Sequence, residues 1–170
     1  RLSHHDEART YLMESLKIAR EIKDDIRALF AVNRLAVLAA VQQDFKEAQT
    51  RFEQCYDLAQ KIGNRERACV AIGNLGQLSA MQGDYPTARE QITRALEIAQ
   101  ELDQQYSMVM AMINLAHVNL QMEDSYNALS QLKNAMRIAQ DSNLITPMLG
   151  VIVRYAQLCA TQGDTDSALC

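Results

Sequence analysis

The sequence predicts an all-α protein built as a solenoid, a row of similar antiparallel helix pairs. The first observation is a 40-residue repeat: alanines recur at positions 8, 48, 88, 128 and 168, and again at 19, 59, 99 and 139. A fixed period of this size is typical of architectures in which one supersecondary unit is stacked several times. The second observation is the spacing of apolar residues by three and four positions, which indicates helices and not strands.

The composition agrees with helices that pack closely through small residues. Hydrophobic residues make up 48% and charged residues 22% of the 170 residues, as in an ordinary globular domain. There is no Trp, and there are three Phe and six Tyr. Plentiful Ala and Leu favour helices over a sheet. Because repeats bury surface mainly against their neighbours, we expect one continuous array.

Charge and cysteine spacing exclude several classes of partner. The net charge is −4 and no block of basic residues occurs, so direct binding to nucleic acid is not expected. The longest weakly charged stretch, residues 28–43, is too short to span a bilayer. Cys55, Cys69, Cys159 and Cys170 lack the paired spacing of a metal site and fit small apolar residues in a reducing compartment. We therefore expect a cytoplasmic protein with no membrane association, metal or cofactor.

Each repeat contains a turn followed by an amphipathic helix. The turns hold an acidic residue suited to cap that helix, since its carboxylate accepts backbone N–H bonds. These residues are Asp44, Asp84, Asp124 and Asp164, and Asp44 forms a capping-box pattern with Glu47. The apolar stripe of the helix, in two successive repeats, is Ala48, Phe52, Cys55, Tyr56, Ala59 and Ile62, then Ala88, Ile92, Ala95, Leu96, Ala99 and Leu102.

A second helix precedes each turn and is apolar on more than one side, as expected for a helix between two neighbours. A small residue in each copy should let two backbones approach closely. The pairs that carry it are Leu35-Ala36, Leu75-Gly76, Leu115-Ala116 and Tyr155-Ala156. Short links between repeats predict antiparallel neighbours, and Thr146-Pro147 suits the start of a helix.

The expected domain organisation is a single array over residues 1–170. It divides into a half unit at 1–24, full units at 25–64, 65–104 and 105–144, and a partial unit at 145–170. Natural arrays usually finish with a polar capping helix, and neither end shows one. We therefore expect a segment truncated at both ends.

One repeat carries a recognisable motif. Leu75-Gly76, Gly83-Asp84-Tyr85, Ala88, Ile92 and Ala95 resemble the tetratricopeptide repeat (TPR). The other repeats depart from this pattern at Gln43, Cys55, Glu123, Ser125 and Thr165. The long unit looks like those of kinesin light chains and of bacterial signal-transduction ATPases and transcriptional activators. The resemblance implies a right-handed superhelix whose concave groove is lined by the first helix of each pair, and it implies binding without catalysis.

The groove is expected to be lined by positions beside the packing stripe of the first helix, spaced by four, three and four. They are Phe30, Arg34, Val37 and Val41; Val70, Asn74, Gln77 and Met81; Met110, Asn114, His117 and Gln121; and Gly150, Arg154, Gln157 and Thr161. Two of these positions are Arg and none is Asp or Glu, so the inner face should be neutral to positive. We therefore expect a ligand with apolar and polar groups and at least one negative charge.

Arg34, Asn74, Asn114 and Arg154 occupy one equivalent position and should form a ladder along the groove. An Asn amide both donates and accepts, which suits an extended peptide backbone, and an Arg suits a carboxylate or phosphate. The resemblance to kinesin light chains implies main-chain clamping by Asn74 and Asn114. The alternative is that each Asn bonds a neighbouring repeat and each Arg is solvated or paired within the chain.

The predicted function is a protein-interaction module that holds a peptide or partner segment, as the sensor or scaffold part of a larger bacterial regulatory protein. One alternative is a domain that senses a small-molecule inducer. Another is a structural spacer that self-associates through its end helices, where Val151, Val153 and Leu158 would be uncovered. No enzyme is expected, because His117 is a lone imidazole without a paired acid or nucleophile.

Overall fold

The computed structural model describes the backbone of residues 2–161 and the side chains of residues 5–160. This part of the chain folds into eight helices and contains no strand, which confirms the predicted all-α class. In order, the helices are α1 (Leu2–Glu21), α2 (Asp25–Val41), α3 (Phe45–Lys61), α4 (Arg65–Met81), α5 (Tyr85–Glu101), α6 (Gln105–Gln121), α7 (Ser125–Asp141) and α8 (Ile145–Thr161).

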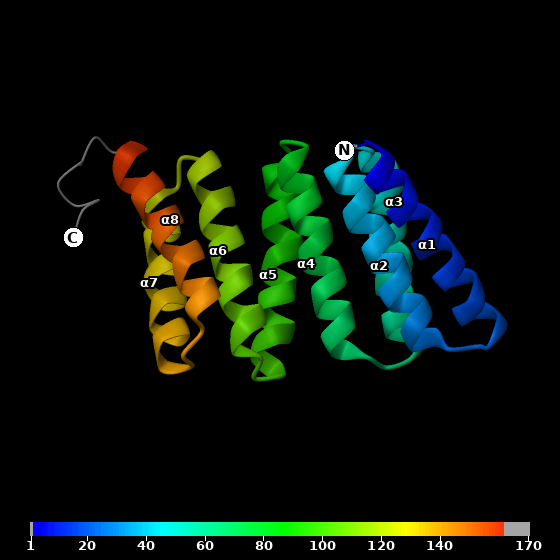
Figure 1. The fold of residues 1–170 in the computed structure, drawn as a ribbon. Coiled ribbons are helices and arrows are strands. Elements are labelled where there is room, and N and C mark those ends of the chain that lie inside the picture. The colour runs from blue at the N-terminus through cyan, green and yellow to red at the C-terminus, as the bar shows by residue number, and fades with distance from the viewer. Residues whose placement is uncertain (1, 162–170) are drawn as a thin grey trace.

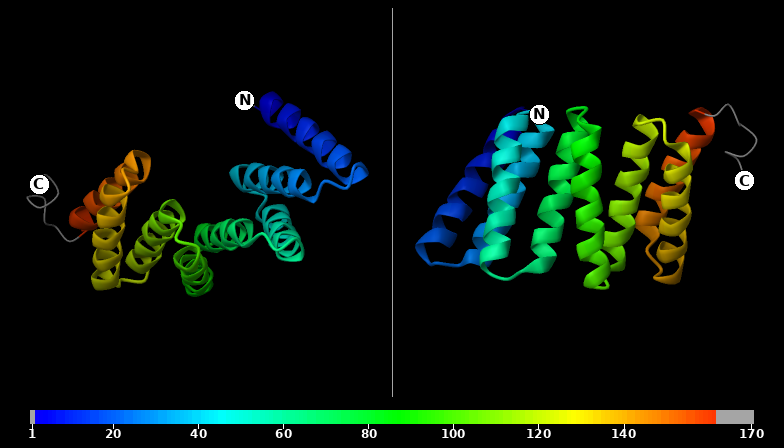
Figure 2. Two further views of the ribbon diagram at one scale, coloured as in Figure 1. Left: turned by 90° about the horizontal axis from the view of Figure 1, so that it is seen from below. Right: turned by 180° about the vertical axis from the view of Figure 1, so that it is seen from behind.

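The helices stand side by side in one row, and successive helices run in opposite directions (Figure 1). Seen from below, the row is curved (Figure 2, left). Helices α2, α4, α6 and α8 lie along the inside of the curve, and we call them the inner helices; α1, α3, α5 and α7 are the outer helices. Each helix packs on the next, and α6 also packs on α4 and α8. The molecule is therefore a solenoid with an inner and an outer face.

Side-chain caps begin most of the helices. Asp44, Asp84 and Asp124 each accept a hydrogen bond from the backbone N–H three residues later, at 3.1, 3.2 and 3.1 Å. This confirms three of the four predicted caps, and Asp164 lies outside the described residues. Asp24 and Asn64 cap α2 and α4 in the same way. Helix α6 begins at Gln104 without a side-chain cap.

The seven turns share one geometry. The residue before each N-cap position has a positive φ, between 52° and 82°, whether or not it is a glycine. These residues are Lys23, Gln43, Gly63, Gly83, Asp103, Glu123 and Asn143. A left-handed residue just beyond a helix lets the next N–H groups bond the last carbonyls, as Asp44 N does to Ala39 O at 2.9 Å. Identical turns keep every helix pair in the same geometry.

Inner and outer helices approach closely at the small residues that the sequence singles out. Ala36 and Ala116 are 0% exposed, and so are Ala48, Ala88 and Ala128 of the outer helices. At Gly76 the approach is closest, because an added Cβ would lie 2.5 Å from Cγ1 of Ile92. The predicted role is confirmed at Ala36, Gly76 and Ala116, whereas Ala156 of α8 is only partly buried.

The cysteines in the described part of the chain are packed thiols. Cys55, Cys69 and Cys159 are free and buried, as expected. The Cys55 and Cys69 thiols point at backbone carbonyls of Leu29 and Ala95. Burial raises the pKa of Cys55 to about 12, so this thiol is unreactive near neutral pH. No cluster of three metal-ligating side chains occurs among the described residues, and Cys170 lies beyond them.

The end of the array differs from the sequence prediction. Val151 and Leu158 are buried, at 1% and 2% exposure, and only Val153 of the three expected residues is uncovered. The reason is that α8 packs on both α6 and α7. The uncovered side of α8 also carries Ile145, Leu149 and Ile152. No helix in the described range is long and apolar enough to cross a membrane.

Gly76→Ala is expected to lower the free energy of unfolding by about 1–3 kcal/mol, because the new Cβ must displace Ile92 or its helix. The matched control is Gly73→Ala, whose Cβ would meet only Cβ of Ala95, at an ordinary 3.6 Å. The control should be neutral or stabilising, by up to about 1 kcal/mol, because alanine favours helix. Urea unfolding followed by circular dichroism distinguishes the two, and equal destabilisation would contradict the close approach at Gly76.

Candidate binding groove

The predicted groove residues all lie on the inner helices, and none of those with a described side chain is buried. On α2, Phe30, Val37 and Val41 are 42%, 40% and 62% exposed, which is unusual for large apolar side chains. Met81 of α4 is 54% exposed. The inner face therefore exposes apolar surface, and the side chain of Thr161 lies outside the described set.

A cavity of about 380 Å³ opens on the inner face between α4 and α6, with α5 beneath it. Five of the predicted groove residues line it: Val70, Asn74 and Gln77 from α4, and Met110 and Asn114 from α6. The other lining residues are Glu66, Cys69, Gly73, Ile92, Ala95, Tyr106, Ser107 and Ala111. The other predicted groove residues, including Met81 of α4 and those of α2 and α8, do not line this cavity.

The neighbouring gap explains why the cavity forms here. Between α2 and α4, the Phe30 ring lies under the Arg67 guanidinium, 4.3 Å from its carbon to the ring centroid. In the same gap Asn74 Nδ2 donates to Asn33 Oδ1 at 3.2 Å. Forty residues later, the positions of Phe30, Asn33 and Arg67 are taken by three smaller residues, Val70, Gly73 and Ser107. The space filled by side chains in one gap is therefore open in the next.

The ladder of four equivalent residues is partly engaged within the chain. Asn74 donates one of its side-chain N–H groups to Asn33 of the preceding repeat. This is the bond to a neighbouring repeat that was the alternative to clamping a peptide. Arg154 Nη1 lies 3.4 Å from His117 Nδ1 and donates to Gln157 Oε1 at 2.9 Å. Asn114 and Arg34 have no side-chain hydrogen bond or ion pair with any described residue. Asn114 and Gln77 are therefore the amides lining the cavity that have no hydrogen bond to a described residue.

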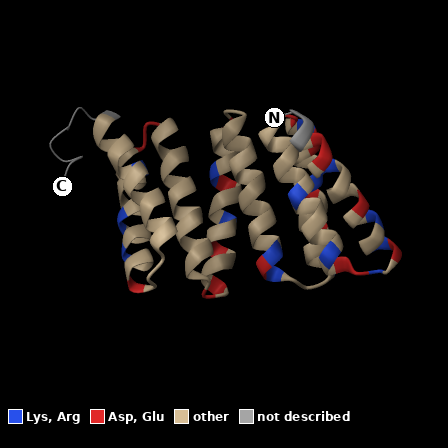
Figure 3. Cartoon of the chain, viewed as in Figure 1, with Lys and Arg blue, Asp and Glu red and all other residues tan. Residues whose placement is uncertain are grey.

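The inner face carries little charge. Helix α6 contains no Lys, Arg, Asp or Glu and is tan throughout in Figure 3. Arg34 and Arg154 flank this neutral region, and neither forms an ion pair with a described carboxylate. Burial and the positive charge of Arg154 both lower the pKa of His117, so this imidazole is neutral at pH 7. The one carboxylate lining the cavity is Glu66.

Sequence reasoning missed Glu66, Gly73, Tyr106 and Ser107 of the cavity. Glu66 and Tyr106 lie four residues before Val70 and Met110, so the same helical spacing extended by one turn would have found them. Gly73 contributes through the side chain that it lacks, and no pattern of polar or apolar residues marks such a position.

A family model described as Tetratricopeptide repeat matches residues 27–101, and one described as Anaphase-promoting complex subunit 5 matches residues 1–41 and 78–157. The tetratricopeptide repeat match, together with the repeated helix pairs, identifies the chain as an array of TPR-type repeats. No curated protein sequence matches it.

Several solved structures share the fold. BtubC (BKLC) from P. vanneervenii has a TM-score of 0.83 and 20% identity, over 96% of this chain and 69% of its own. Aspartyl phosphate phosphatase F from Bacillus subtilis has a TM-score of 0.86 and 13% identity, over 98% of this chain and 45% of its own. A Rap protein complexed with Competence and Sporulation Factor has a TM-score of 0.75 and 15% identity, over 95% of this chain and 51% of its own. The chain thus spans about half the length of the last two.

These likenesses show the TPR-like fold.

Arg154→Gln is expected to raise the pKa of His117 toward its ordinary value of 6.5, because a positive neighbour is removed. In the wild type the folded state binds this proton less readily than the unfolded chain, so stability falls as pH drops below about 6.5. The variant should lose less stability between about pH 7.5 and pH 5.5. An NMR titration of the imidazole signals, with urea unfolding at both pH values, measures this. An unchanged titration would show that Arg154 does not act on His117.

Proposed function

We propose that the chain is a protein-interaction module whose inner face holds an extended segment of a partner protein. The observation that carries the proposal is the cavity between α4 and α6, where the amides of Asn74 and Asn114 meet apolar side chains. A stretched peptide presents one N–H and one C=O per residue and needs both donors and acceptors along its path. The two amides provide both kinds of group.

The cavity suits one anchoring side chain of such a segment. Its volume of about 380 Å³ is at the small end of the range for ligand sites, roughly 300–1,000 Å³. Val70, Met110 and Tyr106 supply apolar and aromatic surface, and a methionine adapts its shape to what it contacts. Asn114 lies beside this surface with its amide free to bond the partner backbone.

Charge suggests where acidic groups of the partner would lie. Arg34 and Arg154 stand one repeat to either side of the Asn pair and have no carboxylate partner among the described residues. A bidentate Arg–carboxylate contact is the strongest polar interaction that this face offers. Glu66 at the cavity disfavours a negative charge there, so the acidic groups of the segment would flank its anchor.

The similarity to a Rap protein complexed with Competence and Sporulation Factor supports a binding role for an array of this shape. We also infer a role as sensor or scaffold within a larger bacterial regulatory protein. The buried free thiols support placement in the cytoplasm. The fold and the groove favour recognition over catalysis.

Asn114→Ala is expected to weaken peptide binding about 3- to 10-fold, because one hydrogen bond to the partner backbone is lost. The measurement begins with selection of random 12-residue peptides displayed on phage against the wild type, followed by titration of the selected peptides by calorimetry. The matched control is Asn134→Ala, since Asn134 is exposed on the outer helix α7 and makes no described contact. The control should bind as the wild type does.

Equal affinity of the wild type and the Asn114 variant would contradict the proposed clamp. If no peptide is selected and native mass spectrometry of the purified protein shows a bound small molecule, the module is an inducer sensor instead. Arg34→Gln should weaken only those peptides that carry an acidic residue beside their anchor.

A further inference from the structure

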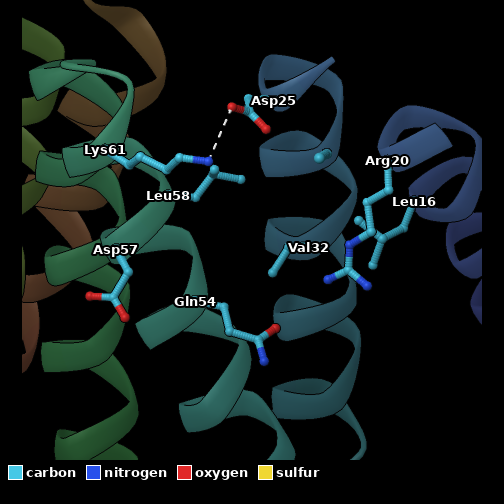
Figure 4. A pocket seen from close by; sticks show the side chains of 9 residues that line it. Leu16, Arg20, Asp25, Val32, Gln54, Asp57, Leu58 and Lys61 are labelled. Carbon is cyan, nitrogen blue, oxygen red and sulfur yellow. Dashed lines mark ion pairs between the residues drawn. The ribbon is translucent and has the colours of Figure 1, made fainter. Parts of the chain in front are cut away.

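A second cavity, of about 420 Å³, lies on the outer face between α1 and α3, with α2 as its floor (Figure 4). Its apolar lining is Leu16, Ala28, Val32 and Leu58, and its polar lining is Arg20, Asp25, Gln54, Asp57 and Lys61. In Figure 4, Arg20 reaches from α1 and Gln54 from α3 toward the space beside Val32. We call this cavity the outer pocket.

The next gap along the outer face, between α3 and α5 above α4, contains a tyrosine of the chain itself. The Tyr56 ring packs against the clusters that include Ala68 and Ile72 of α4. Its hydroxyl accepts hydrogen bonds from Gln60 Nε2 at 2.9 Å and Arg94 Nη2 at 2.6 Å. The Arg94 guanidinium lies 5.5 Å from the centroid of the ring. This gap therefore shows which side chain the repeat geometry accommodates.

The outer pocket has the same surroundings without the ring. Forty residues before Tyr56 stands Leu16, which is 2% exposed and too short to fill the gap. The outer pocket also has one Arg and one Gln as hydrogen-bond donors, but their positions are exchanged. Arg20 stands at the position of Gln60, and Gln54 stands at the position of Arg94. The guanidinium and the amide that hold a phenol hydroxyl in one gap are thus both present in the other.

The floor and the ends of the two gaps also correspond. Ala28 and Val32 stand at the positions of Ala68 and Ile72, so the floor leaves slightly more room. Lys61 Nζ lies 3.8 Å from Asp25 Oδ2, so the two side chains form an ion pair across the outer pocket. Arg65 and Glu101 form the equivalent ion pair in the next gap, with the signs reversed.

We propose that the outer pocket binds a tyrosine side chain presented by a partner protein. The ring occupies the space above Ala28 and Val32, and the hydroxyl accepts hydrogen bonds from Arg20 and Gln54. Arg20 has no hydrogen bond or ion pair with any described residue, so its donors are available. The two cations of the pocket are balanced by two carboxylates, Asp25 and Asp57, which favours a neutral phenol over a phosphorylated one. The site is on the opposite face from the groove and does not depend on its function.

The test uses N-acetyl-tyrosinamide as the probe, with N-acetyl-phenylalaninamide and the O-phosphorylated tyrosinamide as comparisons. Methyl NMR spectra should show shifts at Leu16, Val32 and Leu58, with a Kd of about 1 mM for tyrosinamide. The phenylalanine compound lacks the hydroxyl and should bind about 3- to 10-fold more weakly. Arg20→Ala should remove most of this difference while leaving the phenylalanine compound nearly unaffected.

Two variants fill the pocket with side chains that the chain already uses. Leu16→Tyr introduces the residue of the next gap, and Ala28→Met introduces the residue found at equivalent position 108. Each should reduce tyrosinamide binding at least about tenfold while circular dichroism confirms that the variant is folded. Lys17→Ala, at an exposed position of α1 outside the pocket lining, is the control and should bind as the wild type does.

Three results would overturn the proposal. The first is the absence of shifts at Leu16 and Val32 at saturating tyrosinamide. The second is equal binding of the tyrosine and phenylalanine compounds, which would show that the two donors do not act on the hydroxyl. The third is tighter binding of the phosphorylated compound, which would make the site an anion site. Loss of peptide binding in the groove variants would leave all three measurements unchanged.

Discussion

The close approach of each inner helix to its outer partner is the constraint on which the rest of the structure depends. At Ala36, Gly76 and Ala116 there is no room for a larger side chain, and the facing alanines are fully buried. Because protein interiors are packed as densely as crystals, these contacts fix both the distance and the angle within a helix pair. Because the seven turns share one geometry, successive helix pairs repeat the same arrangement.

A uniform frame makes side-chain size the variable that shapes each gap. On the inner face, Phe30, Asn33 and Arg67 fill one gap, whereas Val70 and Gly73 leave the next one open. On the outer face the filled and open gaps occur in the opposite order along the chain. The two cavities therefore arise where one repeat has smaller side chains than its neighbour, and the filled gap shows which side chains the repeat geometry can accommodate.

The regular features of this fold could be predicted from the sequence because each depends on residues close together in the chain. The caps at Asp44 and Asp84 and the small contact residues follow from local chemistry and helical spacing. The cavity could not be located, since it needs small residues on two helices at once. The bond between Asn74 and Asn33 joins residues a whole repeat apart. Burial of Val151 and Leu158 likewise depends on how α8 rests on α6 and α7.

The restriction of packing to nearby helices has a mechanical consequence. The contacts in the described chain join each helix to the next and to helices one repeat away, so they do not tie the two ends of the row together. The curvature is then the sum of small rotations between successive helix pairs. The stiffness of the array depends on the packing between each pair and the next. A segment seated between α4 and α6 would bridge two such joints. Binding at the middle of the row would therefore change its elasticity and the distance between its ends.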